Sequence, residues 1–516
     1  MQFTDIEYAF FLPIVFILYW FLLRRHLIQR NLLLLSASYV FYGWWDWRFL
    51  ILIIITTCTT YLSGLFTNGR RGKLIVTLNI VINLGILFSF KYLGFFAENL
   101  QKLFSLFGWN LDWFTIKVLL PVGISFYTFQ AIGYTVDVYR KKIKPCTDPI
   151  AFATFIAYFP QLVAGPIERA GDLLPQLQTI RQWKWDNAVS GLRMILFGVL
   201  KKVAVADVLS IYVDQFYGRW GLSNPIIVLL AGILFSFQLY FDFSAYAEIA
   251  RGSSRLLGIE LMANFKFPYF SRNVVEFWRR WHISLMKWFR DYVYIPLGGS
   301  RKGSFKTYIN ISIVFLLSGL WHGAGWNFII WGCYWAVVYL GAKILFKRKV
   351  PENKIQFNDL SKIIITFFVV AYGFLIFRCL NVEQVQICLI NAPVYVIVAL
   401  ILWIISKAIT SNIIKNLVSN PILKLSLIAT VTGCLICAAI VCLIFVFYLN
   451  WEKCLHLYFI LPATFVMLIE WKNRNQEYPF YLQNKNKLLR WGIYWICMLF
   501  IILSEPIDMN FIYFQF

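Results

Sequence analysis

Apolar runs recur along almost the whole chain, and short clusters of Lys and Arg separate them. A helix needs about 20 apolar residues to cross the hydrocarbon core of a bilayer, so runs of about 17–25 residues predict membrane-spanning helices. About twelve full spans are expected by this criterion. They fall at Tyr8–Leu23, before Trp44, before Arg70, before Lys91, and at Val118–Val138, Ala188–Ile211, Pro225–Ala247, Ile363–Phe377, Val394–Ile405, Leu425–Tyr448, Leu455–Ile469 and Leu489–Leu503. The pattern predicts an all-α polytopic membrane protein.

One apolar segment, Ala151–Ile167, carries residues that interrupt a helix. Pro160 lies near its middle and Gly165-Pro166 near its end. Proline removes a backbone donor, and a freed backbone group at membrane depth is tolerated only inside protein or beside a water-filled cavity. We expect a re-entrant element that starts and ends on the same side, with a short kinked span as the alternative.

A second apolar segment, Ile309–Gly341, is long enough for one tilted helix but is basic on both flanks. Arg301 and neighbouring lysines precede it, and Lys343 with a further basic cluster follows it. The positive-inside rule places both flanks in the cytoplasm. Two shorter helices that meet near Trp321–Gly325 satisfy this rule, because glycine permits a close turn. This predicts a helical hairpin with His322 at its apex, and an ionisable residue at membrane depth is by default a candidate functional residue.

The segment Glu276–Tyr292 has apolar and aromatic residues at three- and four-residue steps, which is the spacing of one helical face. That face includes His282, whereas Arg280, Lys287 and Arg290 lie on the opposite face. We therefore expect one amphipathic helix that lies in the membrane interface with its aromatic face buried.

Composition and charge support a membrane protein and indicate its orientation. The 516-residue chain is 60% hydrophobic and only 14% charged. Its net charge is +23, and the Lys and Arg residues responsible lie in short loops between apolar runs, as in membrane proteins. A nucleic-acid partner is therefore not expected. No Lys or Arg precedes the first apolar run, whereas Arg24 and Arg25 follow it, which places the N-terminus outside the cytoplasm. Counting spans from there places the C-terminus outside as well, and the amphipathic segment Lys91–Trp113 on the outer surface.

The candidate chemistry lies in the two tryptophan-flanked histidines, His282 and His322. Catalytic zinc normally takes three protein ligands. Glu276 and Asp291 flank the first histidine, but no acidic residue stands beside the second, so no metal site is expected. A buried imidazole stays neutral and can act as a general base that deprotonates a hydroxyl for attack on an activated acyl group.

Several motifs together resemble the membrane-bound O-acyltransferase family. The similar branch is the bacterial one that contains the alginate O-acetylation membrane subunit and the teichoic acid D-alanyl transfer protein. The motifs are Pro121–Gln130, Gln161–Ile167, Phe277–Leu285, Phe289–Gly299 and Trp321–Gly323. The similarity extends from the aromatic N-terminal spans to Gly341 and is less diagnostic beyond about residue 380.

The resemblance implies a ring of helices with re-entrant or short helices around a central tunnel, where an intracellular donor and an extracellular acceptor meet. It implies His322 as the catalytic residue and His282 as a second essential histidine. It also implies acetyl-CoA as the acyl donor and no covalently bound cofactor. The remaining expected substrate-binding residues are two tryptophans and an acidic residue beside the basic cluster: Trp281, Trp321, Asp291, Arg279, Arg280, Lys287 and Arg290. For the basic residues, contact with donor phosphates and contact with lipid headgroups are both open.

The chain is expected to form one membrane unit with three parts. These are a catalytic core at 1–350 that carries the hairpin, further spans at 351–504, and an extracytoplasmic aromatic tail at 505–516. The tail ends in Phe-x-Tyr-x-x-Phe, which resembles the ending of a small partner protein in the D-alanylation branch. That resemblance makes Tyr513 a candidate acyl relay, and the alternative is a simple interfacial anchor.

The expected function is transfer of an acyl group, with acetyl favoured, across a bacterial inner membrane for O-acylation of an extracytoplasmic polysaccharide. Expected partners are membrane lipids and a periplasmic or extracellular acyl-accepting transferase. Three alternatives remain: transfer of D-alanyl or another acyl group from an acyl carrier protein, acylation of a lipid, and transport without chemistry. A transporter is expected to show internal repeats, and none is evident.

Overall fold

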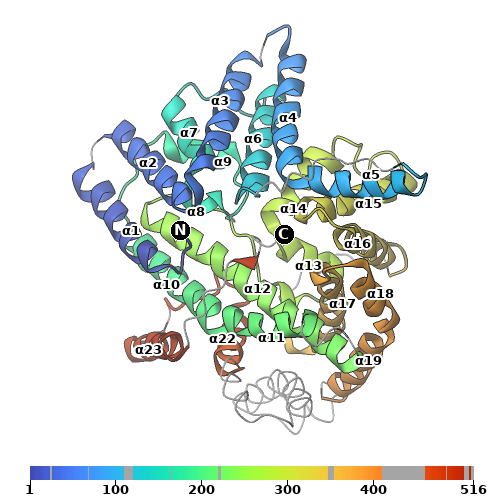
Figure 1. The fold of residues 1–516 in the computed structure, drawn as a ribbon. Coiled ribbons are helices and arrows are strands. Elements are labelled where there is room, and N and C mark those ends of the chain that lie inside the picture. Colours follow the sequence, from blue (N-terminus) through green and yellow to red (C-terminus); the bar gives the residue numbers. More distant parts are fainter. Residues whose placement is uncertain are drawn as a thin grey trace.

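The computed structural model describes residues 1–512 except 24–25, 68, 110–119, 164, 219–221, 223, 347–353, 410–459, 484 and 505–510. Within this part the regular elements are all helices (Figure 1). Six of these helices are long and apolar enough to cross a membrane, or seven if the bent pair Val382–Ile390 and Ala392–Lys407 is one span. The expected all-α multi-pass architecture is confirmed.

The N-terminal helices follow the apolar runs closely. They are α1 (Ile6–Ile17) with a π-helical extension (Leu18–Leu22), α2 (Leu27–Asp46), a 3-10 turn (Trp47–Phe49), α3 (Leu50–Phe66), α4 (Gly72–Leu87), a π-helix (Phe88–Tyr92), α5 (Leu93–Ser105) and α6 (Ile124–Tyr139). The helix expected from Val118 begins only at Ile124. Gly123 before it has φ 75°, and a Cβ there would lie 2.5 Å from the carbonyl oxygen of Leu162. This close approach requires glycine and a non-helical backbone.

The interrupted segment forms three short helices, α7 (Pro149–Ala157), α8 (Phe159–Leu162) and α9 (Ala170–Leu177). The Asp148 side chain accepts from two backbone amides of the first turn of α7, and Pro149 occupies the next position, as in a standard N-cap. The break falls at Tyr158, whose ψ is 111°. The expected interruption is confirmed, and its residues are buried within the protein.

The middle of the chain forms α10 (Trp185–Lys201), a π-helix (Lys202–Ala206), α11 (Asp207–Tyr217) and α12 (Pro225–Leu256). The end expected for the last helix at Ala247 is wrong, because α12 continues to Leu256. Its added turns carry polar residues that are buried and paired; Glu248, for example, accepts from Lys201 at 2.8 Å. Gly191 of α10 and Gly252 of α12 allow the two helices to touch, since a Cβ on either glycine would lie under 3 Å from the other's carbonyl oxygen.

The single amphipathic helix expected over Glu276–Tyr292 is also wrong. After a 3-10 turn (Pro268–Phe270), the structure has α13 (Val274–Arg280), α14 (Ile283–Phe289) and a π-helix (Arg290–Tyr294). The break lies at His282, which takes φ 42° and ψ 54°. The three- and four-residue pattern continues across the break, which is why the sequence suggested one helix.

The histidine hairpin is confirmed as α15 (Ser304–His322) and α16 (Trp326–Ile344), with the turn at Gly323–Gly325. Gly319 and Gly332 allow the two helices to pack closely; a Cβ on Gly319 would lie 2.2 Å from the Phe328 carbonyl oxygen. The C-terminal elements are a 3-10 turn (Phe357–Asp359), α17 (Leu360–Arg378), α18 (Val382–Ile390), α19 (Ala392–Ile409), α22 (Ile460–Asn473) and α23 (Lys487–Leu503). The span expected at Leu425–Tyr448 lies outside the described residues.

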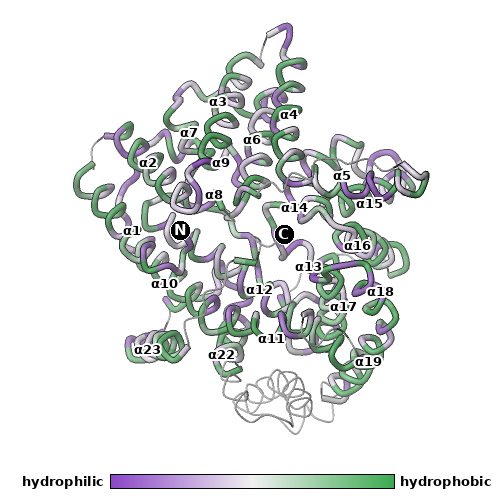
Figure 2. Tube along the Cα trace, in the orientation of Figure 1, coloured by the Kyte–Doolittle hydropathy of each residue, from purple (hydrophilic) through white to green (hydrophobic). Residues whose placement is uncertain are grey.

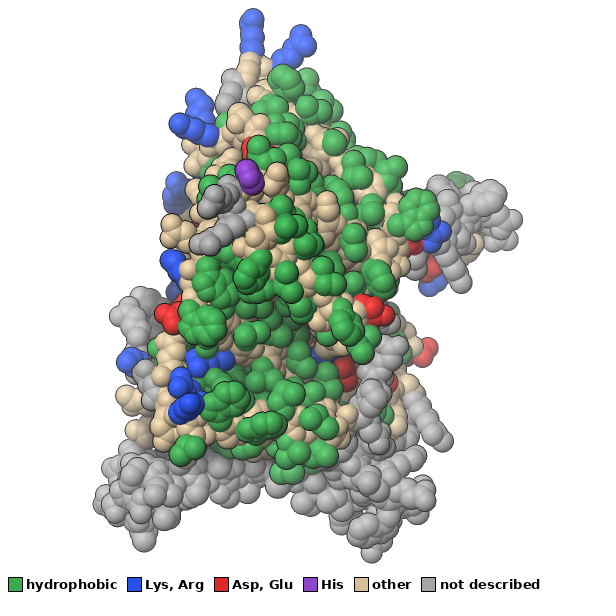
Figure 3. Space-filling view, turned by 90° about the vertical axis from the view of Figure 1, so that its left-hand side faces the viewer, with side chains coloured by type: hydrophobic (Ala, Val, Ile, Leu, Met, Phe, Trp, Pro, Cys, Tyr) green, Lys and Arg blue, Asp and Glu red, His purple; other side chains and the backbone are tan. Residues whose placement is uncertain are grey.

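The outer surface is suited to lipid. Figure 2 shows that the outer helices are hydrophobic over much of their length, with hydrophilic residues at loops, at helix ends and along the buried helix α12. Hydrophobic side chains cover much of the face seen in Figure 3, and Lys and Arg lie mainly toward its margins. Exposed apolar surface on this scale marks contact with a membrane or partner rather than with water.

Candidate active site

The fold brings His282 and His322 together near its centre. Their ring centroids are 6.5 Å apart, and Trp321 lies beside both, at 5.7 Å from His282 and 4.9 Å from His322. Only 1% of His282 and 5% of His322 is exposed. Two histidines from separate helical elements therefore form one buried cluster.

His322 is the last residue of α15 and lies against aromatic side chains of two other helices. Trp331 of α16 and Phe377 of α17 each lie 5.2 Å from its ring and approach it edge-on. The close α15–α16 turn holds the imidazole in this aromatic wall. The tight packing limits the orientations that the ring can take.

His282 occupies a backbone conformation that non-glycine residues seldom adopt. Its φ of 42° lies in the left-handed region, which costs of the order of 1–3 kcal/mol when the residue is not glycine and persists only where the surroundings enforce it. Asn264 helps to enforce it, because its carbonyl oxygen accepts from the Ile283 amide at 2.9 Å and its side chain accepts from Ser284 Oγ at 2.6 Å. Strain of this kind at a non-glycine residue is common at functional sites.

The surroundings of His282 keep its ring neutral. Phe243 of α12 lies 4.8 Å away and edge-on, and Phe126 of α6 is stacked at 6.4 Å. Burial lowers the pKa of the imidazole to about 3. A neutral imidazole can accept a proton or a hydrogen bond at working pH.

Sequence analysis missed Lys91, which the structure places at this cluster. Lys91 Nζ donates to the carbonyl oxygens of Trp321 at 2.8 Å and His322 at 2.9 Å. It also lines a small cavity beside His322, with about 40 Å³ of space for water-sized molecules. The other lining residues come from the segment before α6 and its first turn, from the end of α8 and from the hairpin: Leu120, Pro121, Val122, Gly123, Ile124, Ser125, Phe126, Val163 and Trp321. An isolated lysine within an apolar run was the signal that could have identified it.

The tryptophans expected to bind substrate occupy different places. Trp321 contacts both histidines, whereas Trp281 is 2% exposed and packs against other aromatic rings, with Phe374 at 4.9 Å and Phe265 at 5.0 Å. Trp321 therefore belongs to the histidine cluster, and Trp281 belongs to the adjoining aromatic core.

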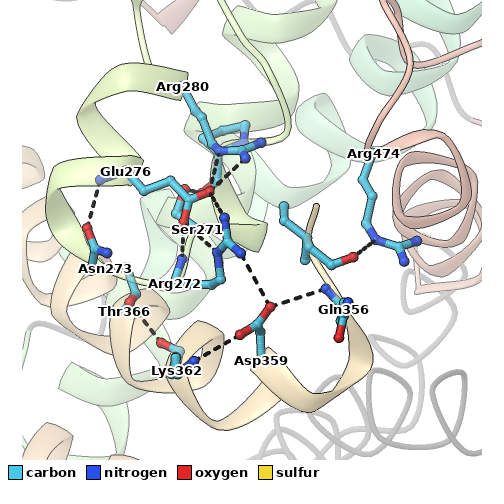
Figure 4. A network of polar contacts seen from close by, with 12 residues as sticks. Ser271, Arg272, Asn273, Glu276, Arg280, Gln356, Asp359, Lys362, Thr366 and Arg474 are labelled. Atoms are coloured by element: carbon cyan, nitrogen blue, oxygen red, sulfur yellow. Dashed lines mark hydrogen bonds and ion pairs between the residues drawn. The ribbon is translucent and has the colours of Figure 1, made fainter. Parts of the chain in front are cut away.

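Arg280 takes part in a polar network that anchors α13 (Figure 4). Glu276 Oε1 accepts from Arg280 at 2.7 Å, and its Oε2 accepts from Arg272 Nε at 3.0 Å. Arg272 also pairs with Asp359, at the start of α17, at 3.5 Å. Burial opposes ionisation of Glu276, but the hydrogen bonds from Arg272 and the charge of Arg280 outweigh it and hold the pKa of this carboxyl below its ordinary value. Arg280 thus has a protein partner, and the network fixes the helix that leads into His282.

The other predicted polar residues lie on the surface of α13 and α14 or just beyond them. Arg279, Lys287 and Arg290 are exposed. Asp291 accepts from Arg290 at 2.7 Å and from Arg169 at 2.8 Å. The three exposed cations are free of the histidine cluster and face away from the core.

Tyr513 lies outside the described residues, but the two residues before it are buried in the protein. Phe511 packs 4.6 Å from the Tyr246 ring and 5.8 Å from the Phe243 ring on α12. The Ile512 amide donates to Asp242 Oδ2 at 2.7 Å. Since Phe243 also contacts His282, this part of the tail reaches the surroundings of the histidine cluster.

Asp242 belongs to a buried set of charges between α10, α11 and α12. Lys202 Nζ lies 3.0 Å from Asp242 and 2.6 Å from Asp207. Among the residues that the structure describes, no three His, Cys, Asp or Glu side chains gather as a metal site.

Comparison with known proteins identifies the family. The family model of the membrane-bound O-acyltransferases matches residues 147–386. The probable alginate O-acetylase AlgI of Pseudomonas putida is 41% identical over 392 residues, which cover 74% of this chain and 78% of the relative. The chain belongs to the membrane-bound O-acyltransferase family.

Two further relatives show the range of acceptors in this family. The peptidoglycan O-acetyltransferase of Helicobacter pylori is 31% identical over 406 residues, covering 72% of this chain and 76% of the relative. The teichoic acid D-alanyltransferase of Bacillus subtilis is 30% identical over 270 residues, covering 50% of this chain and 68% of the relative. The protein is therefore a multi-pass membrane acyltransferase whose relatives modify polysaccharides or cell-wall polymers.

Proposed function

We propose that this acyltransferase moves an acetyl group from cytoplasmic acetyl-CoA across a bacterial inner membrane for O-acylation of an extracytoplasmic polysaccharide. The relatives named for alginate and peptidoglycan O-acetylation support the acetyl group and the class of acceptor. Because the family consists of acyltransferases, we do not propose transport without chemistry as the function.

The observation that carries the mechanism is the buried pair of histidines beside a small cavity, with His322 at the apex of the hairpin. His322 acts as the general base and takes the proton of an acceptor hydroxyl. The hydroxyl oxygen then bonds to the acyl carbon while the carbon–sulfur bond of the thioester breaks. The proton returns from the imidazolium to the departing CoA thiolate, so the base is regenerated.

His282 supports this step from beside His322, because both rings contact the same Trp321 ring and lie 6.5 Å apart. Its strained backbone aims a neutral ring into the cluster, where it orients the acyl donor or the hydroxyl by hydrogen bonding. Trp321 forms the shared apolar wall that separates the reacting groups from water.

The donor is proposed to approach along the basic surface of α13 and α14. Arg279, Lys287 and Arg290 are exposed there and can contact the phosphates of acetyl-CoA. Arg280 and Asp291 contribute through their ion pairs, which hold α13 and the π-helix after α14 in place. Trp281 packs beneath this surface and supports it.

Tyr513 is proposed as an acyl relay on the extracytoplasmic side. Phe511 and Ile512 are buried against α12, and Phe511 packs on Phe243, which in turn contacts His282. This position of the tail supports the role. Deprotonation by His322 would activate the phenol, which is a poor nucleophile at neutral pH because its pKa lies near 10. The oxygen of a hydroxyl of a periplasmic transferase or of the polymer then bonds to the acyl carbon of the Tyr513 ester. The bond between that carbon and the phenol oxygen breaks, and the hydroxyl proton passes to the tyrosine.

Substitution of the two histidines tests this function. His322→Ala leaves a folded, membrane-inserted protein without polymer acylation, because alanine fits an apolar hairpin but cannot take the proton. His282→Ala lowers acylation severely at unchanged expression. Normal acylation in a stably expressed His322→Ala protein contradicts the assignment, and loss of expression alone in His282→Ala makes that histidine structural.

A second candidate is transfer of D-alanine or another acyl group from an acyl carrier protein. The teichoic acid D-alanyltransferase relative favours it, and the exposed cations of α13 and α14 would then be a docking surface for an acidic protein. Purified protein with radiolabelled acetyl-CoA separates the two, because only the first function consumes this donor without a carrier protein.

A further inference from the structure

The end of α15 leaves backbone carbonyls that require partners. The last four carbonyl oxygens of an α-helix have no partner within the helix. In α15 these include Leu320, Trp321 and His322, because the chain turns to an extended conformation at Gly323, with φ −168°. The carbonyl of the proposed catalytic residue is thus one of the groups that another part of the chain must satisfy.

Two consecutive residues of a distant segment satisfy all three carbonyls. Tyr92 Oη donates to Leu320 at 2.8 Å, while Lys91 Nζ donates to Trp321 at 2.8 Å and His322 at 2.9 Å. Both lie in the π-helix Phe88–Tyr92 between α4 and α5. A single π-helical turn inside an α-helix is frequently a functional feature, because the extra residue redirects side chains.

The same segment also contacts the other side of the turn. Trp326, the first residue of α16, donates from Nε1 to Asn99 Oδ1 at 3.0 Å, and its ring lies 6.0 Å from that of Phe95 on α5. Both ends of the Gly323–Gly325 turn are therefore held by α5 and the π-helix before it.

We propose that Lys91 and Tyr92 form an apex clamp that positions His322 for acyl transfer. The role of His322 in this inference rests on the function proposed above, whereas the clamp itself rests on the hydrogen bonds. Lys91 Nζ lies at the C-terminus of α15 and donates to carbonyl oxygens that have no partner within the helix. Holding the His322 carbonyl fixes the position of its Cα and so the point from which the imidazole reaches the cavity.

General core packing does not account for the clamp. No residue of α5 is buried, so this helix adds little to the hydrophobic core. Its contacts converge on the hairpin turn, and Lys91 lines the same cavity as His322. Because a misplacement of about 1 Å at a reacting group costs about 100-fold in rate, a segment of this kind can control catalysis without touching the donor.

The test compares Lys91→Met and Tyr92→Phe with two matched controls. Lys91→Met keeps the apolar stem and removes the donors, and Tyr92→Phe removes one hydroxyl. Lys102→Met and Tyr139→Phe make the same changes at exposed residues outside the clamp. Amide hydrogen exchange is measured over residues 320–326 in detergent-solubilised protein, together with kcat and KM for the acyl donor.

We expect faster exchange at the apex in both clamp variants, and kcat lowered about 10- to 100-fold while KM for the donor changes less than about twofold. The controls should match the wild type in exchange and in kcat. Wild-type exchange at the apex in Lys91→Met and Tyr92→Phe overturns the clamp, as does a fall in activity that appears only as a raised KM. The exchange readout does not depend on the reaction, so an active His322→Ala protein would remove the proposed function without removing the clamp.

Discussion

The hydrogen bond from the Ile512 amide to Asp242 holds the C-terminal tail against α12, so weakening this bond should weaken docking of the tail. Asp242→Asn keeps the size and one oxygen of the side chain but removes its charge. The 2.7 Å bond from Ile512 is then no longer charge-assisted, and Lys202 loses the negative charge of Asp242 while that of Asp207 remains. We expect the tail to dissociate from α12 more often and polymer acylation to fall.

The magnitude follows from the change in the type of bond. A hydrogen bond to a charged group contributes about 1.5–3 kcal/mol and a neutral one about 0.5–1.5 kcal/mol, so loss of the charge costs about 1–1.5 kcal/mol. Since about 1.4 kcal/mol corresponds to a factor of ten, docking of the tail should weaken about 5- to 10-fold. The apolar contacts of Phe511 remain, so the tail still docks part of the time and some activity persists.

The assay is amide hydrogen exchange of the peptide that contains Ile512, measured beside polymer acylation and acetyl-CoA consumption. Asp207→Asn is the matched control, because it removes a carboxylate from Lys202 without touching Ile512. Faster exchange in Asp242→Asn than in Asp207→Asn is the expected result. Equal exchange in the two variants would show that the effect passes through Lys202, and unchanged exchange in Asp242→Asn would refute the reasoning.

Two further predictions concern the relay and the topology. Tyr513→Phe keeps an aromatic ring and removes only the hydroxyl, so we expect loss of polymer acylation and no acyl label on the C-terminal peptide; full acylation would leave the tail as an anchor. In a cysteine-free background, single cysteines at Lys287 or Arg301 should react with an impermeant reagent only in inside-out vesicles, and one at Asn510 in intact spheroplasts. The reverse pattern at any of these positions contradicts transfer from a cytoplasmic donor to an extracytoplasmic acceptor.

Local physical chemistry was sufficient to predict the hairpin. Basic clusters on both sides of Ile309–Gly341 required two helices instead of one, and the glycines near His322 marked the turn. The same kind of local signal, proline within an apolar run, located the interruption before Pro160. Such features depend on residues that are close in sequence, and the bilayer imposes the same requirements on every segment.

Local patterns failed where the backbone interrupts a regular spacing, or where a charged side chain is paired inside the protein. The helical spacing around His282 continues through a left-handed residue, so periodicity alone could not reveal the break. Arg280 looked like a free cation, yet Glu276 holds it within a network that reaches Asp359. The end of α12 was placed too early because Glu248 is charged, although Lys201 neutralises it within the protein.

The sequence by itself determined the class of protein, most of its helices and the two histidines on which the chemistry is proposed to depend. Hydrophobic length, charge bias and helix-breaking residues are sufficient for these, because the membrane acts as a uniform solvent. Only the tertiary structure decided that His282 and His322 share Trp321, that Lys91 and Tyr92 hold the apex, and that Phe511 and Ile512 lie against α12. These contacts join residues far apart in the chain, and their energy depends on packing and desolvation that no local pattern records.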